Sequence, residues 1–460
     1  MNLHSLYSAI STPVETCVIG SGGFGQSFVA QALRVPKMNA RIAVDRDSAI
    51  AARALAVSGV PKDAIVEVGD AAAAKAAWAA GKFIAAGSLD AVIDLPFQVV
   101  VEATGHPESA ARHALAAIEA GRHVALVSKE ADSVCGPGLA RLAADRGKVV
   151  TPVDGDQPSL LIGLASWAEV LGLEIVAAGK SSEYDFVFDA ASGSVTSNGM
   201  SLAIPGLGAH WAAGSDVRAT SAAREQLLAP HFPLRAVPDL CEMGIVANAM
   251  GLMPDRADFH APVARIPEVA TLLAEKTSGG LLSGDRRLDV FHHLRAADEA
   301  SFAGGVFVVV RCHDRTSWDM LAAKGHAVSA AGDTAMLYLP RHILGLEAAT
   351  SVLDAAGLGR SGYGDDYRPR VDLVAVATRD LAAGTLMTAS GHHHTIDGVR
   401  AEMRPSQPLS DDSPAPFYLV ADRPLARSVR AGTTVRLGDL QMDETSVLYR
   451  LRLQQDGMFG

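Results

Sequence analysis

The chain has 460 residues, more than one hydrophobic core ordinarily holds, so two or three domains are expected. A net charge of −11 without a basic stripe excludes nucleic acid as a partner. No apolar run reaches the roughly 20 residues that cross a bilayer, and the polar start lacks a signal-peptide pattern. Four widely spaced cysteines, Cys17, Cys135, Cys241 and Cys312, indicate a reducing compartment. We therefore expect a cytoplasmic protein that does not bind membranes.

The first predicted elements form a dinucleotide-binding unit. The apolar strand Thr16–Ile19 runs into a glycine-rich turn, and an amphipathic helix follows. A second strand, Arg41–Val44, ends at Asp45. This order of strand, glycine turn, helix, strand and acid is typical of an NAD- or NADP-binding fold. The candidate cofactor residues in the turn are Gly20, Gly22, Gly23, Phe24 and Gly25.

The residues after the second strand leave the choice of cofactor open. Asp45 would accept hydrogen bonds from the 2′-hydroxyl of the adenine ribose, which favours NAD. Arg46 would hold a 2′-phosphate, which favours NADP. Because of this arginine the sequence slightly favours NADP over NAD.

The rest of residues 1–155 alternates strands and helices, which predicts a doubly wound, parallel Rossmann sheet. Expected strands are Val99–Glu102, His123–Leu126 and Val149–Pro152, with helices at Glu108–Ala120 and Pro137–Arg146 between them. The carboxyl ends of such strands line a bound dinucleotide. The candidate cofactor contacts at these ends are Thr104, Gly105, His106 and Ser128.

Three charged residues near the end of this unit are candidates for chemistry. Lys129 follows a strand and would polarise a substrate carbonyl or donate a proton during hydride transfer. Asp154 and Asp156 flank a glycine, and their carboxylates would bind a divalent metal, Mg²⁺ or Mn²⁺, or cap the following helix. Both interpretations stay open, and Asp156 is also a catalytic candidate.

Residues 156–364 predict an α+β substrate and dimerisation domain with a mixed sheet. Lys180 and Glu183 follow the strand Leu173–Ala178 and are a candidate acid–base pair in a cleft. Glu242 lies on an otherwise apolar helix, Leu240–Ala249, where an acid is either a ligand or a paired buried group. Other expected elements are the helices Ser159–Leu171 and His342–Ala356 and the strands Val306–Arg311 and Ala335–Tyr338.

A linker rich in glycine and arginine, Gly357–Arg370, separates this domain from a C-terminal region with strand patterns and glycine turns. These patterns predict an all-β domain over residues 371–455. The triplet His392-His393-His394 lies inside it, and adjacent histidines on a strand point to opposite faces. We therefore expect the triplet, like His292-His293, to lie on the surface.

Together these motifs resemble a known family. The glycine turn, Glu102-Ala103-Thr104-Gly105 and Ser128-Lys129-Glu130 are similar to the cofactor domain of homoserine dehydrogenases. The runs Gly155-Asp156-Gln157-Pro158-Ser159-Leu160, Ala178-Gly179-Lys180 and Glu242-Met243 are similar to 1-deoxy-D-xylulose-5-phosphate reductoisomerase-like proteins. That homoserine-dehydrogenase-like group ends in a SAF (β-clip) domain, which the resemblance places at residues 371–455.

The resemblance implies an NADPH-linked reductoisomerase that rearranges and reduces 1-deoxy-D-xylulose 5-phosphate in isoprenoid biosynthesis. It also implies a homodimer formed through the middle domain and a divalent metal on the substrate oxygens. Two positions depart from the family pattern, because Pro238 and Glu183 stand where lysines are expected. The loss of two cations weakens the case for a phosphorylated substrate.

Other small-molecule substrates therefore stay open. A homoserine-type dehydrogenase, or one acting on another polyol or hydroxy acid, is an alternative enzyme. A SAF-domain sugar-acid lyase or an NAD(P)-gated sensor is the alternative from another class.

Overall fold

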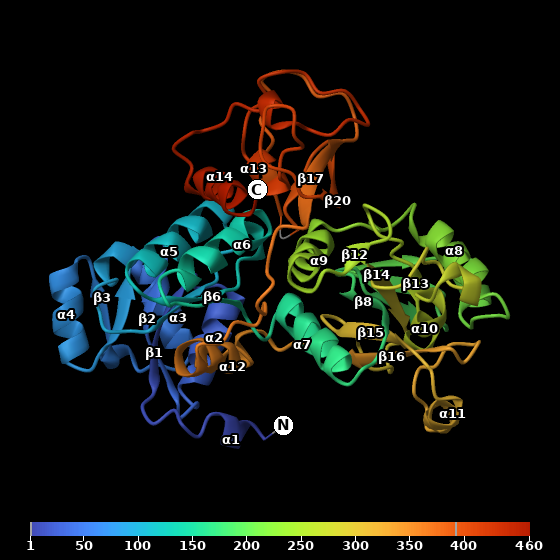
Figure 1. Cartoon of the computed structure of the whole chain (residues 1–460), viewed down its shortest axis with the longest axis horizontal. Coiled ribbons are helices and arrows are strands. Elements are labelled where there is room, and N and C mark those ends of the chain that lie inside the picture. The colour runs from blue at the N-terminus through green and yellow to red at the C-terminus, as the bar shows by residue number, and fades with distance from the viewer. Residues whose placement is uncertain (1, 392) are drawn as a thin grey trace.

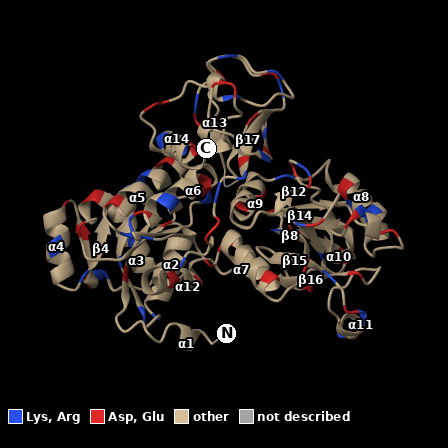
Figure 2. Cartoon of the chain, viewed as in Figure 1, with Lys and Arg blue, Asp and Glu red and all other residues tan. Residues whose placement is uncertain are grey.

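The computed structural model describes residues 2–391 and 393–460 and arranges them in three units (Figure 1). A Rossmann-like unit and a mixed-sheet unit lie side by side, and the C-terminal unit lies across the junction between them. Acidic and basic residues are interspersed over all three units (Figure 2). Over the described ranges, no helix has the length and apolar character needed to span a membrane.

The first unit contains a seven-stranded parallel sheet in the order β3-β4-β2-β1-β5-β6-β7, which confirms the expected α/β class. Most central strands are buried on both faces, so they appear in the sequence as continuous apolar runs. The two short outer strands, β3 and β4, were not predicted. The strands are β1 (Val14–Ile19), β2 (Met38–Val44), β3 (Ile65–Val68), β4 (Phe83–Ala86), β5 (Val99–Glu102), β6 (His123–Leu126) and β7 (Val150–Pro152). The helices are α1 (Leu3–Leu6), α2 (Gly23–Ala32), α3 (Ser48–Val57), α4 (Ala71–Ala79), α5 (Pro107–Glu119) and α6 (Lys129–Ala144).

The sequence predicted a helix that begins at Pro137, but helix α6 begins at Lys129. A proline inside a helix removes a hydrogen bond and usually marks an end, which is why the prediction was wrong. The neighbouring Gly138 instead lets the helix pack closely, because a Cβ there would lie 2.8 Å from the Cβ of Gln455. The early start places Lys129 and Glu130 in the first turn of the helix, beside the end of β6.

The second unit is a mixed sheet whose main path is β11-β10-β9-β14-β8-β15-β16. Strand β8 runs parallel to β14 and antiparallel to β15, so this sheet has the mixed character that was expected. Its strands are β8 (Ile175–Ser181), β9 (Phe186–Asp189), β10 (Ser194–Ser197), β11 (Met200–Ala203), β12 (Met253–Pro254), β13 (Val263–Ala264), β14 (Arg287–Arg295), β15 (Val306–Arg311) and β16 (Thr334–Leu339). Its helices are α7 (Gln157–Val170), α8 (Val217–Leu228), α9 (Val237–Met250), α10 (Val269–Leu272) and α11 (Arg315–Ala323).

After β16 the chain returns to the first unit. The single helix predicted over His342–Ala356 is wrong, because a 3₁₀ turn (Leu344–Leu346), helix α12 (Ala349–Leu353) and a π-helical turn (Asp354–Leu358) replace it. The break follows from the backbone of Leu344, whose φ of 56° is not helical. Gly345 then lies against α2, where a Cβ would be 2.4 Å from the backbone nitrogen of Phe28.

The C-terminal unit combines short strands with two helices. Strand β17 (Val371–Ala377) pairs antiparallel with β20 (Val399–Pro405), and β18 (Ala389–Ser390) pairs with β19 (Thr395–Ile396). A short helix, α13 (Phe417–Val420), and the terminal helix α14 (Val447–Phe459) complete it. The all-β expectation to residue 455 is therefore wrong at α14. Arginine and glutamine share the buried face of that helix with leucine, so its sequence lacks a plain apolar stripe.

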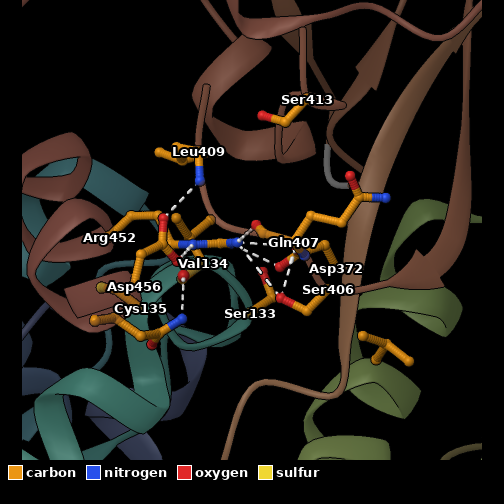
Figure 3. Close-up of polar contacts among 12 residues, drawn as sticks. Ser133, Val134, Cys135, Asp372, Ser406, Gln407, Leu409, Ser413, Arg452 and Asp456 are labelled. Carbon is orange, nitrogen blue, oxygen red and sulfur yellow. Dashed lines mark hydrogen bonds and ion pairs between the residues drawn. The ribbon is translucent and has the colours of Figure 1, made fainter. Parts of the chain in front are cut away.

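A buried ion pair anchors α14 (Figure 3). The Arg452 guanidinium donates to both carboxylate oxygens of Asp372 on β17, at 2.6 and 2.9 Å, and to Asp456 at 2.8 Å. The side-chain oxygen of Gln455 accepts the backbone N–H of Gly138 in α6 at 2.9 Å. The ion pair thus holds α14 against β17 within the C-terminal unit, and the Gln455 hydrogen bond fastens that helix to α6 of the Rossmann-like unit.

The interdomain linker is ordered by two tyrosines. The rings of Tyr363 and Tyr367 stack with centroids 4.0 Å apart, and both hydroxyls donate to the buried carboxylate of Asp132, at 2.5 and 2.6 Å. Burial raises the pKa of Asp132 from 3.8 to about 7, although these hydrogen bonds oppose the rise.

The pKa of Asp132 predicts a pH-dependent stability. Between pH 4 and 7 the folded chain retains a proton that the unfolded chain releases, so the free energy of unfolding falls as pH rises. We expect Asp132→Asn to make the pH dependence of the free energy of unfolding shallower by about 1.4 kcal/mol per pH unit, which is the slope that one retained proton contributes. Urea unfolding at several pH values measures the slope. Asp94→Asn, at an exposed position, is the control, and an unchanged slope in Asp132→Asn would contradict the prediction.

Candidate functional site

The glycine turn after β1 has the geometry of a dinucleotide site. A Cβ at Gly20, where φ is 98°, would lie 2.5 Å from the carbonyl oxygen of Ala103, and one at Gly25 would lie 2.0 Å from that of Gly20. Both positions therefore require glycine. At Gly22 and Gly23 a Cβ would meet no atom within 4 Å, so open space lies before the amino end of α2. Free N–H groups at a helix start bind phosphate.

This space continues into a cavity of about 710 Å³ beside the sheet. Asp45 lines it, and its carboxylate accepts the N–H groups of Ser21 at 2.9 Å and of Arg46 at 2.8 Å. The exposed Arg46 lies at the same cavity, so the residues present fit either NAD or NADP. The predicted residues that line the cavity are Gly20, Gly22, Asp45, Arg46, Thr104 and His106.

The other predicted cofactor residues support the cavity from outside its lining. Phe24 packs against the core beneath α2. Gly105 donates its N–H to the hydroxyl of Ser128 at 2.9 Å. Ser128 immediately precedes α6, so the cofactor loop is tied to the start of the helix that carries Lys129.

A compact charged cluster lies at this helix start, and it contains all five residues that the sequence proposed for catalysis. The Lys129 ammonium pairs with Glu242 and lies 3.6 Å from Asp156. Lys180, at the end of β8, pairs with the other oxygen of Glu242 and with Glu183 at 2.7 Å. Glu242 thus bridges two lysines that come from different units.

Burial and charge set the ionisation of the cluster. Burial alone would lower the pKa of both Lys129 and Lys180, but the neighbouring carboxylates outweigh it and raise both well above the ordinary value. The Lys180 ammonium lowers the pKa of Glu183 to about 2. Both lysines are therefore protonated at neutral pH. Lys180 is fully buried, whereas a quarter of the Lys129 side chain is exposed.

Sequence reasoning missed one member of the cluster. Asp239 lies 3.1 Å from the Lys180 ammonium and accepts the Ser182 hydroxyl at 2.6 Å and the Glu183 N–H at 3.1 Å. Burial raises its pKa to about 6. The available signal was its position three residues before Glu242, because residues at that spacing share one face of a helix.

The two aspartates proposed as metal ligands already have hydrogen-bond or ion-pair partners within the protein. Asp154 accepts the hydroxyls of Ser159 at 2.7 Å and Thr350 at 2.5 Å. Asp156 caps α7 through the Gln157 N–H at 3.0 Å and faces Lys129. In the described part of the chain, no three His, Cys, Asp or Glu side chains are grouped to hold a metal ion. These donors do not fit a divalent cation.

The expected surface positions of the histidine pairs are wrong for the described residues. His292 and His293 are buried in β14, and burial lowers the pKa of each to about 4. His393 lies against the ring of Tyr184 with centroids 5.4 Å apart, and His394 contacts Glu130 at 3.2 Å. The loop carrying them folds back onto the other units, a long-range contact with no local signal. His392 lies outside the described residues.

Two family models match parts of the chain. The one described as "Homoserine dehydrogenase, NAD binding domain" matches residues 20–151, which include the glycine turn and Lys129. The one described as "Oxidoreductase DRL, catalytic domain" matches residues 235–348, which include Asp239 and Glu242. A search of curated proteins found no match.

Solved structures match with 10–21% sequence identity in the cases compared. GenD2 from gentamicin A biosynthesis, in complex with NAD, is 20% identical with a TM-score of 0.26, over 39% of this chain and 45% of that chain. An Agrobacterium radiobacter oxidoreductase in complex with NAD⁺, L-tartaric acid and magnesium is 16% identical with a TM-score of 0.27, over 40% and 47%. Biliverdin reductase from Synechocystis sp. PCC 6803, with biliverdin and NADP⁺, is 21% identical with a TM-score of 0.24, over 38% and 48%. This chain covers less than half the length of each.

The parallel sheet, the cofactor cavity and the two family matches support an NAD(P)-dependent oxidoreductase. The charged cluster has one member, Lys129, in the first matched region and two, Asp239 and Glu242, in the second. The cofactor-binding region and the oxidoreductase catalytic region therefore meet at one site.

The open space at Gly22 allows a prediction about cofactor binding. Gly22→Val should fold normally, because a Cβ at this position has no protein atom within 4 Å, but it should weaken NADH and NADPH binding at least tenfold by filling the phosphate space. Fluorescence titration measures the affinity. Gly69→Val, at another open glycine outside the cavity, is the matched control. Unchanged affinity in Gly22→Val would overturn the cofactor site.

Proposed function

We propose that the chain reduces a carbonyl group on a small, oxygen-rich substrate with NAD(P)H, and that Lys129 supplies the proton. The observation that carries this proposal is the Lys129 ammonium itself. It is held by Glu242 and Asp156 at the first turn of α6, it is partly exposed, and Ser128 ties its helix to the cofactor loop.

Bound NAD(P)H would supply a hydride to the substrate carbon. The Lys129 ammonium would hydrogen-bond the carbonyl oxygen, stabilise the negative charge that develops there and transfer one proton to it. The raised pKa keeps Lys129 charged before the reaction, so the ammonium is present to stabilise the negative charge on the carbonyl oxygen. Its exposed face would recover a proton from solvent.

The remaining cluster residues would position Lys129. Lys180 is too buried to reach a substrate, so its role would be to hold Glu242, which in turn orients the Lys129 ammonium. Glu183 and Asp239 would offset the buried charge of Lys180. A buried ammonium without such partners would be strongly destabilising.

The charge balance bears on the class of substrate. Four carboxylates surround two ammonium groups, and Asp239 is the one whose pKa is raised toward neutrality. A phosphate placed directly in this cluster would meet net negative charge. The cluster therefore favours an uncharged sugar, polyol or hydroxy-carbonyl compound at the reacting end.

A second candidate is the reductoisomerase reaction on 1-deoxy-D-xylulose 5-phosphate. It rests on the sequence resemblance described above, while the match of residues 235–348 to the oxidoreductase DRL catalytic domain supports an oxidoreductase in general. In that case the phosphate would have to bind away from the lysine pair. No step of the proposed mechanism passes through a metal, since the donors of Asp154 and Asp156 do not fit one.

We also propose a cytoplasmic homodimer formed through the middle unit. Strand β16 is an edge of the mixed sheet, and it borders an apolar hollow of about 930 Å³. Half-exposed Trp167 and the exposed Tyr338 and Leu339 line this hollow. An exposed apolar edge strand is protected by pairing with a second copy. Light scattering of the purified chain measures the oligomeric state.

The role of Lys129 predicts a specific kinetic result. Lys129→Met should lower kcat by about 10²- to 10⁴-fold, the usual contribution of a positioned acid. The affinity for NADPH should remain as in the wild type, because the cofactor turn is untouched. Stopped-flow and steady-state NADPH oxidation measure both. Lys75→Met, at an exposed surface pair, is the control, and a kcat within twofold of wild type would remove Lys129 from the chemistry.

A substrate panel separates the candidate functions. NADH and NADPH oxidation would be followed with 1-deoxy-D-xylulose, its 5-phosphate, unphosphorylated sugars and hydroxy-carbonyl compounds, with and without Mg²⁺ or Mn²⁺. Turnover of uncharged compounds without metal supports the first proposal. Metal-dependent turnover of the phosphate alone supports the reductoisomerase. Cofactor binding without turnover of any compound would favour a SAF-domain lyase or a sensor and overturn both.

A further inference from the structure

The C-terminal unit touches the charged cluster through three side chains. His393 packs against Tyr184, the residue after Glu183, with ring centroids 5.4 Å apart and the rings tilted by 42°. His394 contacts Glu130, the residue after Lys129, at 3.2 Å. Tyr418 of α13 lies close enough to Cys241, the residue before Glu242, for that thiol to contribute to the raised pKa of the tyrosine. Each contact is thus made to the immediate sequence neighbour of a cluster residue.

The two histidines lie at the turn of the β18–β19 hairpin. The N–H of His394 donates to the carbonyl of Gly391 at 3.3 Å, and its backbone has a φ of 51°. A residue other than glycine is held in this left-handed region only when its surroundings enforce it. Those surroundings include the ring of Tyr418, which meets the His394 ring edge-on at 5.7 Å.

The hairpin is bound to both sides of the cluster. Glu130 belongs to α6 of the Rossmann-like unit, and Tyr184 belongs to the turn between β8 and β9 of the mixed-sheet unit. Lys129 and Glu183 are carried by the same two segments. A hairpin that contacts both segments holds the two halves of the cluster at a set separation.

The charges of these contacts are complementary. Glu130 is buried, one of its carboxylate oxygens faces His394, and the other has no hydrogen-bond partner in the described part of the chain. His393 adds to the effect of Lys180 in lowering the pKa of Glu183. The imidazole groups therefore lie where they would keep two carboxylates of the site oriented.

We propose that the β18–β19 hairpin is part of the active site: His394 anchors the C-terminal unit on Glu130, and His393 positions Glu183 and Tyr184 beside the ion-paired Lys180, Glu242 and Lys129. The two histidines are positioning residues, since they act through Glu130, Tyr184 and Glu183. The inference rests on the function proposed above, and it assigns the C-terminal unit a role in that same site.

Kinetics of three variants test the role of His393. His393→Ala should lower kcat by about tenfold to a hundredfold, the loss typical of a small misplacement in a site, while the affinity for NADPH is unchanged. His393→Gln should recover part of this loss through its polar group. His393→Phe should not, because it restores only the ring contact with Tyr184. His313→Ala, at an exposed loop histidine paired with Glu174, is the control.

Two kinetic results would overturn the role. If His393→Phe restores full activity, the ring only packs. If His393→Ala retains the kcat of the wild type, the residue does not position the site.

Hydrogen exchange tests the contact without relying on turnover. The Glu183 N–H is held by Asp239, and we expect the amides of residues 181–185 to exchange at least tenfold faster in the double variant His393→Ala, His394→Ala than in the wild type. Unchanged exchange would overturn the hairpin contact. Faster exchange in a chain whose wild type reduces no substrate would support the contact and reject only the proposed function.

Discussion

The arrangement of the three units depends on the burial of one ammonium group. Lys180 is inaccessible to solvent at the end of β8, and a charge so placed is tolerated only when carboxylates surround it. Glu183 comes from the adjacent turn, but Asp239 and Glu242 come from α9. The need to pair Lys180 therefore determines where the first two turns of α9 lie.

Helix α9 transmits this constraint to the whole molecule. It is buried along almost its whole length, and its side chains are mostly apolar apart from Asp239, Glu242 and Asn248. It packs on α6 of the Rossmann-like unit, on α7 and β14 of the middle unit, and on β17 and β20 of the C-terminal unit. Because Glu242 also pairs with Lys129, a shift of any unit against α9 would disturb the candidate proton donor. The ion pairs of the site and the packing between the units therefore both depend on the position of α9.

The parts of the site that were predictable are those with a local signature. The glycine turn, Asp45 and the parallel sheet were predictable because short sequence segments in the order strand, glycine turn, helix, strand and acid are typical of a dinucleotide-binding fold. Lys129 and Lys180 were found because each lies at or just after a strand end. Asp239 was missed because its partner Lys180 lies far away in the chain, and nothing near Pro238 indicates a buried lysine. His393 and helix α14 were misjudged for a related reason, since their faces are defined by contacts with other units.

The position of Glu183 gives the departure from the family pattern a physical meaning. The resemblance places a cation there, which would attract an anionic substrate group. In this chain the side chain accepts a hydrogen bond from Lys180 at 2.7 Å, and that ammonium holds its pKa near 2. The substitution therefore reverses the role of the position, because a group that would have bound the substrate now neutralises a lysine of the protein. With Pro238 offering no charge at the other departing position, the attraction for a phosphate is lost at both places. What is left near the Lys129 ammonium is a set of carboxylates able to accept hydrogen bonds from hydroxyl groups, and on this ground we propose a polyhydroxylated, uncharged reacting end.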